Sequence, residues 1–458
     1  MINRLYITKF FTVIASCIIL ISCYSNQRRD NNIKVEESRP LSFTTDDEFL
    51  DFIQKTHINY MWEGAEQISG LAPERIHMDG IYPQDDADVI TTGGSGFGIA
   101  GLIVGIERGF IPREEGVGRL HKISDYLANA DRYHGVWSHW ITGPTGKTKP
   151  FSQKDNGGDL VESAFLMQGL LIAREYFKDG NENEKLLAEK IDRLWREMEW
   201  DWYLNGKDVL YWHWSPDYNW EMNFPLEGYN ECLITYILAA SSPTHPIPSS
   251  AYHNGWARGG AIKSENEAYG YPLILKHNGA EDYGGPLFWA HYSYIGLSPK
   301  GLRDKYADYW LLNRNQAMIN YLYCVQNPNN YDGYGENCWG LTASYTVDGY
   351  TAHMPFINDK GVITPTAALS SFPYTPEESM RALKHFYYEI GDSIWGKYGF
   401  YDAFSLQHDW FPQHYLAIDQ LTIAPMIENY RTGLLWNLFM KAPEIQEGIK
   451  KLGFTYTP

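Results

Sequence analysis

The distribution of apolar residues along the chain predicts a mainly helical protein. Nearly continuous apolar segments that open with glycine alternate with segments in which apolar residues recur every three or four positions among charged ones. The first kind is typical of helices buried on all sides, and the second of helices with one face in solvent. The predicted inner and outer pairs are Gly93–Gly109 with Pro112–Ala130, Gly157–Phe177 with Glu182–Trp200, and Thr364–Ser371 with Pro376–Ile390. Further helices are expected at Gly228–Ala240, Gly301–Val325, Asp419–Tyr430 and Leu434–Lys441.

The glycine-led openings indicate a loose internal repeat. Gly93, Gly157 and Gly228 are separated by 64 and 71 residues, a spacing typical of repeated helical hairpins. We therefore expect an all-α fold, an (α/α)6 toroid or barrel with long aromatic-rich loops and small β-hairpins. In such a ring the inner helices begin on one face. A linear helical solenoid is the alternative, although solenoids have shorter and more regular repeats.

Three carboxylates stand at the polar start of an apolar helix in segment 154–168, KDNGGDLVESAFLMQ. Asp155 precedes two glycines, and Asp159 and Glu162 lie three residues apart, on one helix face. Because buried carboxylates need a partner or a function, we predict that all three belong to a site. The alternative is an N-cap with two solvated acids. Glu231, after a second glycine-marked turn, is the other candidate, and its alternative role is to complement a helix dipole.

Long loops between the predicted helices are rich in aromatic residues. Segment 200–224 contains five tryptophans, and the alternation over Val209–Trp214 predicts a short strand or hairpin. Exposed ring faces suit stacking on sugar rings, so we predict a cleft lined by aromatic side chains. A packed minicore of the loops is the alternative. The predicted substrate-binding residues are Trp140, Trp212, His213, Trp220 and Trp289.

The N-terminus predicts export. Two basic residues precede an apolar run over residues 10–21 that is too short for a membrane span and ends in the sequence LISC. The ending resembles a bacterial lipoprotein signal, so residues 1–22 are the expected signal peptide, Cys23 the lipid anchor and 23–43 a flexible tether. A plain signal peptide is the alternative. Residues 44–458 are expected to form one domain, located in the periplasm or at the outer membrane of a Gram-negative bacterium.

Composition and charge narrow the choice of partners. The chain has 458 residues, of which 44% are hydrophobic, and a formal net charge of −18. This charge argues against nucleic acid and favours a neutral ligand. Cys232, Cys324 and Cys338 form no CxxC pair, and no P-loop, HExxH or GxSxG motif is present. We expect a monomer with no cofactor and no catalytic metal. A structural cation is left open at the loop aspartates Asp85, Asp86 and Asp88.

Carboxylates together with aromatic loops in an exported acidic chain favour glycoside hydrolysis. In that reaction one carboxylic acid protonates the leaving oxygen, and a second carboxylate activates water or attacks carbon. Four motifs also resemble a known family, the glucoamylase-like domain of Bacteroidetes proteins and specifically glycoside hydrolase family 144. These motifs are KDNGGDLVESAFLMQGLL, EGYNECLITYILAASSPTHP, GGPLFWAHYSY and IAPMIENYRTGLLW. The resemblance spans roughly residues 45–455.

The resemblance implies an (α/α)6 barrel that hydrolyses β-1,2-glucan with inversion and without a metal, either internally or by releasing sophorose from chain ends. By position, Asp155, Asp159 and Glu162 match the family's acidic cluster, and Glu231 matches its other essential acid. We assign Glu231 as general acid, Asp159 or Asp155 as base, and Glu162 as the group that tunes the pair. Since a helix N-terminus lowers the pKa of Glu231, neighbouring carboxylates and a dry aromatic wall have to raise it. Further base candidates are Asp402, Asp419 and Glu428.

Three other functions remain open at this stage. The family's older label suggests a glucoamylase-type α-glucan hydrolase. A non-catalytic glycan-binding lipoprotein would use the same aromatic cleft without cleaving its ligand. A polysaccharide lyase on a similar toroid is disfavoured, because it needs basic residues for uronates and this chain is acidic.

Overall fold

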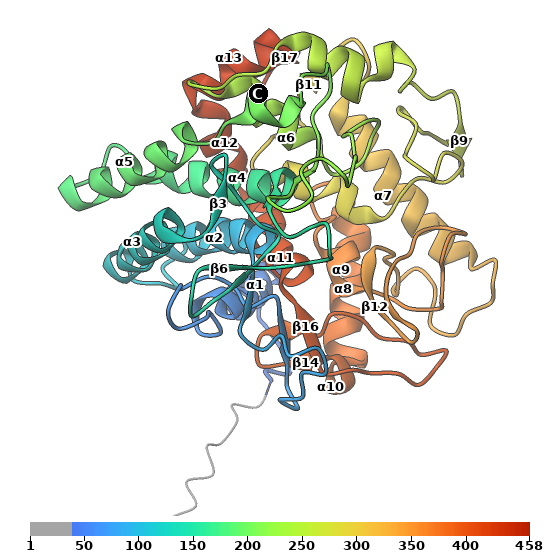
Figure 1. Ribbon diagram of the computed structural model, residues 1–458. Coiled ribbons are helices and arrows are strands. Elements are labelled where there is room, and N and C mark those ends of the chain that lie inside the picture. The colour runs from blue at the N-terminus through green and yellow to red at the C-terminus, as the bar shows by residue number, and fades with distance from the viewer. Residues whose placement is uncertain (1–38) are drawn as a thin grey trace, which may run out of the picture. The chain divides into compact units, whose positions relative to one another are not determined.

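Two apolar helices, α2 (Thr92–Glu107) and α4 (Leu160–Phe177), pack against each other in the computed structural model, which describes residues 39–458 (Figure 1). Nearly every side chain of both helices is buried, as their apolar sequences predict. The helices approach closely because Gly96 faces Gly169. A Cβ atom at position 169 would lie 2.0 Å from the carbonyl oxygen of Gly96, so a larger residue does not fit there.

The other inner helices extend this pair on both sides. On one side α11 packs against α2 and α1, and α8 packs against α11, while on the other side α6 packs against α4. The charged helices α3 and α5 cover α2 and α4 from outside, which confirms the predicted inner and outer pairs (Figure 1). These elements are α1 (Asp46–Trp62), α3 (Arg113–Asn129), α5 (Glu182–Arg196), α6 (Leu233–Ser241), α8 (Pro365–Leu369) and α11 (Ala417–Arg431).

Several predicted helix boundaries were wrong, among them the start of α6, which lies at Leu233 rather than Gly228. Helix α7 begins at Tyr309 rather than Gly301, because the Asp308 side chain accepts a hydrogen bond from the Leu311 N–H and caps the helix there. Helix α9 ends at Lys384 and continues as a π-helical turn, η6. Helix α4 begins at Leu160, three residues after Gly157. The helices α1, α10 and α13 were not predicted. The remaining helices are α7 (Tyr309–Gln326), α9 (Pro376–Lys384), α10 (Gly391–Ile394), α12 (Leu434–Lys441) and α13 (Pro443–Lys451). Single turns are η1 (Trp200–Leu204), η2 (Ala251–Trp256), η3 (Arg258–Gly260), η4 (Leu287–Ala290), η5 (Tyr292–Tyr294) and η6 (His385–Glu389).

The strands are short, and the pair that matters for the site joins distant segments. Strand β8 (His213–Trp214) lies within the predicted stretch and pairs antiparallel with β7 (Gly158–Asp159) at the start of α4. His213 and Asp159 are direct partners in this register. The same stretch also folds back locally, with antiparallel bridges from Tyr211 to Pro225 and from Ser215 to Asn219.

The remaining strands also form small antiparallel sheets. The three-stranded sheet is β2 (Val89–Thr91), β5 (Trp140–Thr142) and β6 (Lys147–Lys149). The pairs are β1 (Arg75–His77) with β16 (His414–Leu416), β3 (Arg132–Tyr133) with β4 (Val136–Trp137), β9 (Glu267–Ala268) with β10 (Tyr271–Pro272), β11 (Leu302–Arg303) with β17 (Thr455–Tyr456), β12 (Ala343–Thr346) with β13 (Gly349–Ala352), and β14 (Trp395–Gly396) with β15 (Gly399–Phe400).

The predicted signal peptide, its lipid anchor Cys23 and most of the predicted tether lie outside the described residues. Phe43–Pro458 form one compact unit. Cys232, Cys324 and Cys338 are buried free thiols, in line with the absence of a predicted disulfide framework. From residue 39 onward, no helix is both long and apolar enough to cross a membrane.

Candidate active site

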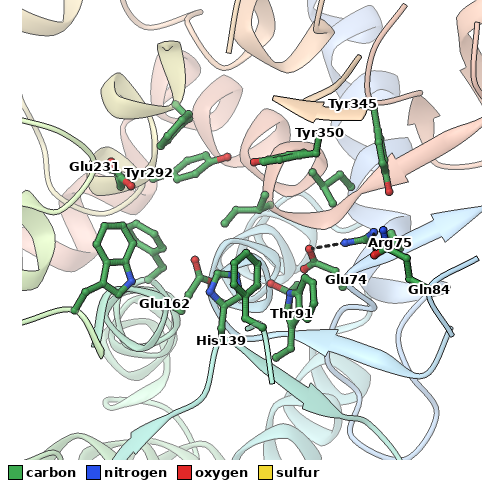
Figure 2. A pocket seen from close by; sticks show the side chains of 17 residues that line it. Glu74, Arg75, Gln84, Thr91, His139, Glu162, Glu231, Tyr292, Tyr345 and Tyr350 are labelled. Carbon is green, nitrogen blue, oxygen red and sulfur yellow. Dashed lines mark hydrogen bonds and ion pairs between the residues drawn. The ribbon is translucent and has the colours of Figure 1, made fainter. Parts of the chain in front are cut away.

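A cavity of about 340 Å³ opens where four inner helices begin (Figure 2). Thr91 caps α2, Glu162 lies in the first turn of α4, Glu231 precedes α6, and Ile418 lies in the first turn of α11. The convergence of helix starts is the arrangement that we expected for the inner helices of a ring. The lining residues are Glu74, Arg75, Gln84, Thr91, His139, Trp140, Phe151, Glu162, Phe165, Trp212, Glu231, Phe288, Tyr292, Tyr345, Tyr350, Leu416 and Ile418.

Glu231 lies at the wall of this cavity with its backbone held on both sides. The Ser293 hydroxyl donates a hydrogen bond to the Glu231 carbonyl, and the Asn230 side chain accepts one from the Cys232 N–H at 3.0 Å. Burial raises the pKa of Glu231 to about 7; its own backbone N–H opposes this rise, and the charge of Asp159 adds to it. The carboxyl can therefore hold a proton near neutral pH and give it to a leaving group.

Glu162 is fixed at the cavity floor by the start of α2. Its Oε2 accepts a hydrogen bond from the Gly93 N–H at 2.8 Å, and a Cβ atom at position 93 would lie 2.3 Å from that oxygen. Burial raises the pKa of Glu162 to about 8, against the positive charge of His139 and with the help of the negative charges of Asp159 and Glu74. Glu162 therefore also carries a proton at neutral pH.

Asp159 is completely buried and does not line the cavity. Its Oδ1 accepts hydrogen bonds from the N–H groups of Val161 and Glu162 at 3.0 and 2.9 Å and so caps α4. Its Oδ2 accepts a hydrogen bond from His139 Nδ1 at 3.0 Å. Burial acts to raise the pKa of Asp159, but the hydrogen bond and charge of His139 outweigh it and lower the pKa. Asp159 is thus an ionised anchor for the start of α4.

Asp155 and His213 complete a network behind the cavity wall. His213 Nε2 lies 3.3 Å from Asp155 Oδ2 and 3.8 Å from Asp159 Oδ2, as the pairing of β8 with β7 allows. Neither Asp155 nor His213 lines the cavity. The four predicted catalytic acids therefore cluster, but only Glu162 and Glu231 face the cavity.

The His139 network predicts a stability that depends on pH. Burial alone would lower the pKa of His139, but the charges of Glu162 and Asp159 and the hydrogen bond to Asp159 raise it to about 10. A raised histidine pKa gives stability that is complete below the unfolded value of about 6.5 and is lost as pH rises through the folded value. We expect the free energy of unfolding to fall between about pH 6.5 and 10, since Glu162 acts in the same direction. Urea unfolding at several pH values in this range measures the free energy of unfolding. If this free energy falls as steeply with pH in His139→Gln as in the parent chain, His139 is not the cause of the fall.

Glu74 is a cavity acid that the sequence analysis did not identify. Its N–H donates to the Val89 carbonyl at 2.8 Å and its carbonyl accepts from the Ala417 N–H at 2.9 Å, so it is held between β2 and the start of α11. Its Oε1 lies 3.6 Å from Arg75 Nη2, and Arg75 also pairs with Asp86 at 3.2 Å. Glu74 precedes a short strand and follows no apolar periodicity, so the sequence contains no local signal for it.

The loop aspartates considered for a structural cation do not form such a site in the described residues. Asp86 instead pairs with Arg75. Within residues 39–458, two groups of three side chains bring possible metal-ligand atoms within 4.8 Å of one another. These groups are His77, Asp79 and His414, and His139, Asp155 and Asp159.

The other base candidates, Asp402, Asp419 and Glu428, also lie outside the cavity lining. Burial raises the pKa of Asp402 to about 7 and that of Asp419 well above its usual range. Tyr292 donates to Asp419 at 2.9 Å, and the Tyr345 N–H donates to Asp402 at 2.8 Å. Glu428 forms an ion pair with Arg108.

The predicted aromatic residues divide into two groups. Trp140 and Trp212 line the cavity. Trp220 packs against Tyr203 and Tyr211, with ring centroids 5.9 and 5.8 Å apart, and Trp289 is buried beside Tyr229; neither lines the cavity. Further cavity rings that were not named from the sequence are Phe151, Phe165, Phe288, Tyr292, Tyr345 and Tyr350.

Residues 223–443 match the family model described as Glycoamylase, a glucoamylase family. The chain is 60% identical to the endo-β-1,2-glucanase from Chitinophaga pinensis, whose structure contains sophorotriose and glucose. The superposition has a TM-score of 0.89 and covers 90% of this chain and 99% of that chain.

A second relative comes from Parabacteroides distasonis and is longer. The curated protein is an exo β-1,2-glucooligosaccharide sophorohydrolase (non-reducing end), 46% identical over 448 residues, which are 93% of this chain. The present chain spans 60% of the length of that protein. A solved β-1,2-glucanase from the same organism is 46% identical with a TM-score of 0.84, over 90% of this chain and 60% of that chain.

Proposed function

The chain belongs to the glucoamylase-like family, of the glycoside hydrolase family 144 type, and from this premise we propose that it is a glycoside hydrolase that cleaves β-1,2-glucan or its oligosaccharides. The observation that carries the proposal is Glu231, a carboxyl group that holds its proton near neutral pH at the wall of an aromatic-lined cavity. The substrate class follows from the β-1,2-glucan relatives, and the apolar ring faces suit a neutral sugar.

Glu231 acts as general acid in this proposal and protonates the glycosidic oxygen as the carbon–oxygen bond breaks. Burial outweighs the lowering of its pKa that we expected from the helix start. The acids that we favoured as base from the sequence, Asp159 and Asp155, have their carboxylates engaged by His139 and His213 behind the wall. We assign them a positioning role at the start of α4, and Glu162 keeps the tuning role. A water molecule attacks with inversion at the anomeric carbon.

The proposal includes the closed (α/α)6 ring. Its support is the order of contacts α8, α11, α2, α4 and α6 among the inner helices, together with four helix starts at one cavity. Export, a lipid anchor at Cys23 and a monomeric state remain predictions. Labelled palmitate that enters the parent chain in cells but not Cys23→Ser would support the anchor, and equal labelling of both would refute it.

Trp212 offers a test of sugar stacking at the cavity. Loss of its ring removes about 0.5–1.5 kcal/mol of ring contact beyond the buried area, so we expect Trp212→Ala to raise KM about 10-fold with a smaller change in kcat. Initial rates across substrate concentrations measure both. Trp220→Ala is the matched control, because this ring belongs to the same loop but lies outside the cavity. Equal KM values for the two variants would contradict the stacking role.

Incubation of the purified chain with linear β-1,2-glucan and, in parallel, with soluble starch tests the proposed function. We expect sophorose or a ladder of β-1,2-linked oligosaccharides from the first substrate alone. The product ladder distinguishes internal cutting from release at chain ends. Glucose from starch would support the glucoamylase alternative instead, and binding of glucan without new reducing ends would support the glycan-binding alternative.

A further inference from the structure

Hydrolysis with inversion needs a second carboxylate that is ionised, faces the cavity and stands apart from the general acid. The geometry excludes most acids near the site. Asp155 and Asp159 lie behind the wall with histidine partners, and Asp419 and Asp402 accept hydrogen bonds from the Tyr292 hydroxyl and the Tyr345 N–H. None of these four lines the cavity.

Three carboxylates remain at the cavity, namely Glu231, Glu162 and Glu74. Figure 2 shows Glu231 and Glu74 on opposite sides of the cavity, with Glu162 between them. Glu162 already receives the Gly93 N–H, and burial raises its pKa to about 8, so it holds a proton under the conditions in which a base must accept one. Only Glu74 among the described cavity acids combines separation from Glu231 with a cationic neighbour.

The contacts of Glu74 place its carboxyl group beside a cationic side chain. Arg75 Nη2 lies 3.6 Å from its Oε1, and the Glu74 side chain is 9% exposed. The Arg75 guanidinium also faces Asp86 at 3.2 Å and lies over the Trp140 ring, 5.6 Å from its centroid. Because Arg75 divides its charge between two carboxylates, it stabilises the charge of Glu74 without holding that side chain in a close bidentate pair.

We propose that Glu74 is the general base of the hydrolysis proposed above, on which this inference rests. Its carboxylate takes a proton from a water molecule as the water oxygen forms a bond to the anomeric carbon. The bond from that carbon to the leaving oxygen breaks, and the leaving oxygen takes the proton of Glu231. Glu74 ends protonated and Glu231 ionised, and proton exchange with solvent restores both. The opposite positions of the two carboxylates suit attack and departure on opposite faces of the sugar ring.

Glu74→Gln is the first test of this role. We expect kcat on β-1,2-glucan to fall about 10²–10⁴-fold while KM changes only a few-fold, since the amide keeps the shape but accepts no proton. Asp86→Asn is the matched control, because Asp86 pairs with the same Arg75 from outside the cavity lining. If kcat of Asp86→Asn stays within a few-fold of the parent value, the loss in Glu74→Gln comes from the missing base and not from a displaced Arg75.

Azide supplies a second readout that a structural role would not produce. In Glu74→Ala, azide can reach the anomeric carbon without a base, and Glu231 still protonates the leaving oxygen. We expect turnover to recover and to yield an α-glycosyl azide, which mass spectrometry and NMR identify. Three outcomes would each overturn the base assignment while leaving the hydrolase function intact. These are a kcat of Glu74→Gln equal to that of the parent chain, a loss of kcat in Asp86→Asn as large as that in Glu74→Gln, and the absence of an azide product. If the parent chain itself releases no product, the proposed function fails, and the base assignment falls with it.

Discussion

Replacing Glu231 by glutamine is expected to lower kcat on β-1,2-glucan about 10³-fold with little change in KM. The amide fills the same space at the cavity wall but has no acidic proton for the leaving oxygen, and general acid catalysis contributes a factor of this size. Release of reducing ends at saturating substrate measures the loss. Glu227→Gln is the control, because Glu227 lies on the same loop with a side chain that is 42% exposed and 3.7 Å from Arg258.

A substrate with a better leaving group tests the acid role of Glu231 more directly. A substrate whose leaving group needs no proton, such as an aryl β-sophoroside with an acidic phenol, should recover most of the activity lost in Glu231→Gln. We also expect kcat/KM of the parent chain to fall as pH rises above about 7, the pKa of Glu231, and the variant to lose this limb. Equal losses on glucan and on the activated substrate would show that Glu231 has another role.

Removal of the Asp159 side chain is expected to produce the largest loss of stability. Asp159→Ala deletes the cap of α4 and removes the fully buried partner of the His139 cation, whose own side chain is 20% exposed, which costs about 3 kcal/mol in the free energy of unfolding. Asp159→Asn keeps an oxygen that can accept the N–H groups of Val161 and Glu162, so its loss should be smaller. Urea unfolding of the three chains at pH 7 compares these values.

The same pair of variants separates an anchor from a base. If Asp159 anchors α4, azide restores no activity to Asp159→Asn, in contrast to its effect on Glu74→Ala. Equal stability of the alanine and asparagine variants would contradict the capping role, and an azide product from Asp159→Asn would return the base role to Asp159. Ser163→Ala, in the same helix turn, controls for general disturbance of α4.

The helical layers were predictable because their signal is local. The apolar runs of α2 and α4 cannot be solvated, and the charged faces of α3 and α5 cannot be buried, so the inner and outer positions follow from composition alone. The ends of the helices and the pairing of the strands were harder to predict. The cap at Asp308 and the pairing of β7 with β8 depend on side-chain and backbone partners that periodicity does not contain.

In the candidate site, too, residues with a local sequence signal could be predicted, whereas residues placed by distant contacts could not. Glu162 and Glu231, which both line the cavity, could be proposed from the sequence because each sits at the polar start of an apolar helix. Glu74 had no such context, since it reaches the cavity through backbone hydrogen bonds to Val89 and Ala417, far away in sequence. Trp289 was predicted to bind substrate but lies outside the cavity lining, because an aromatic residue in a loop has the same local signal whether it faces a ligand or packs beside Tyr229.

The most direct measurement of the central claim is proton NMR of linear β-1,2-glucan during the first minutes of cleavage by the purified chain. Two carboxyl groups on opposite sides of the cavity predict that the first reducing ends appear as the α-anomer and convert to the β-anomer only by mutarotation. First formation of the β-anomer would contradict the inverting arrangement of Glu231 and Glu74. The absence of any new anomeric signal would contradict the hydrolase itself.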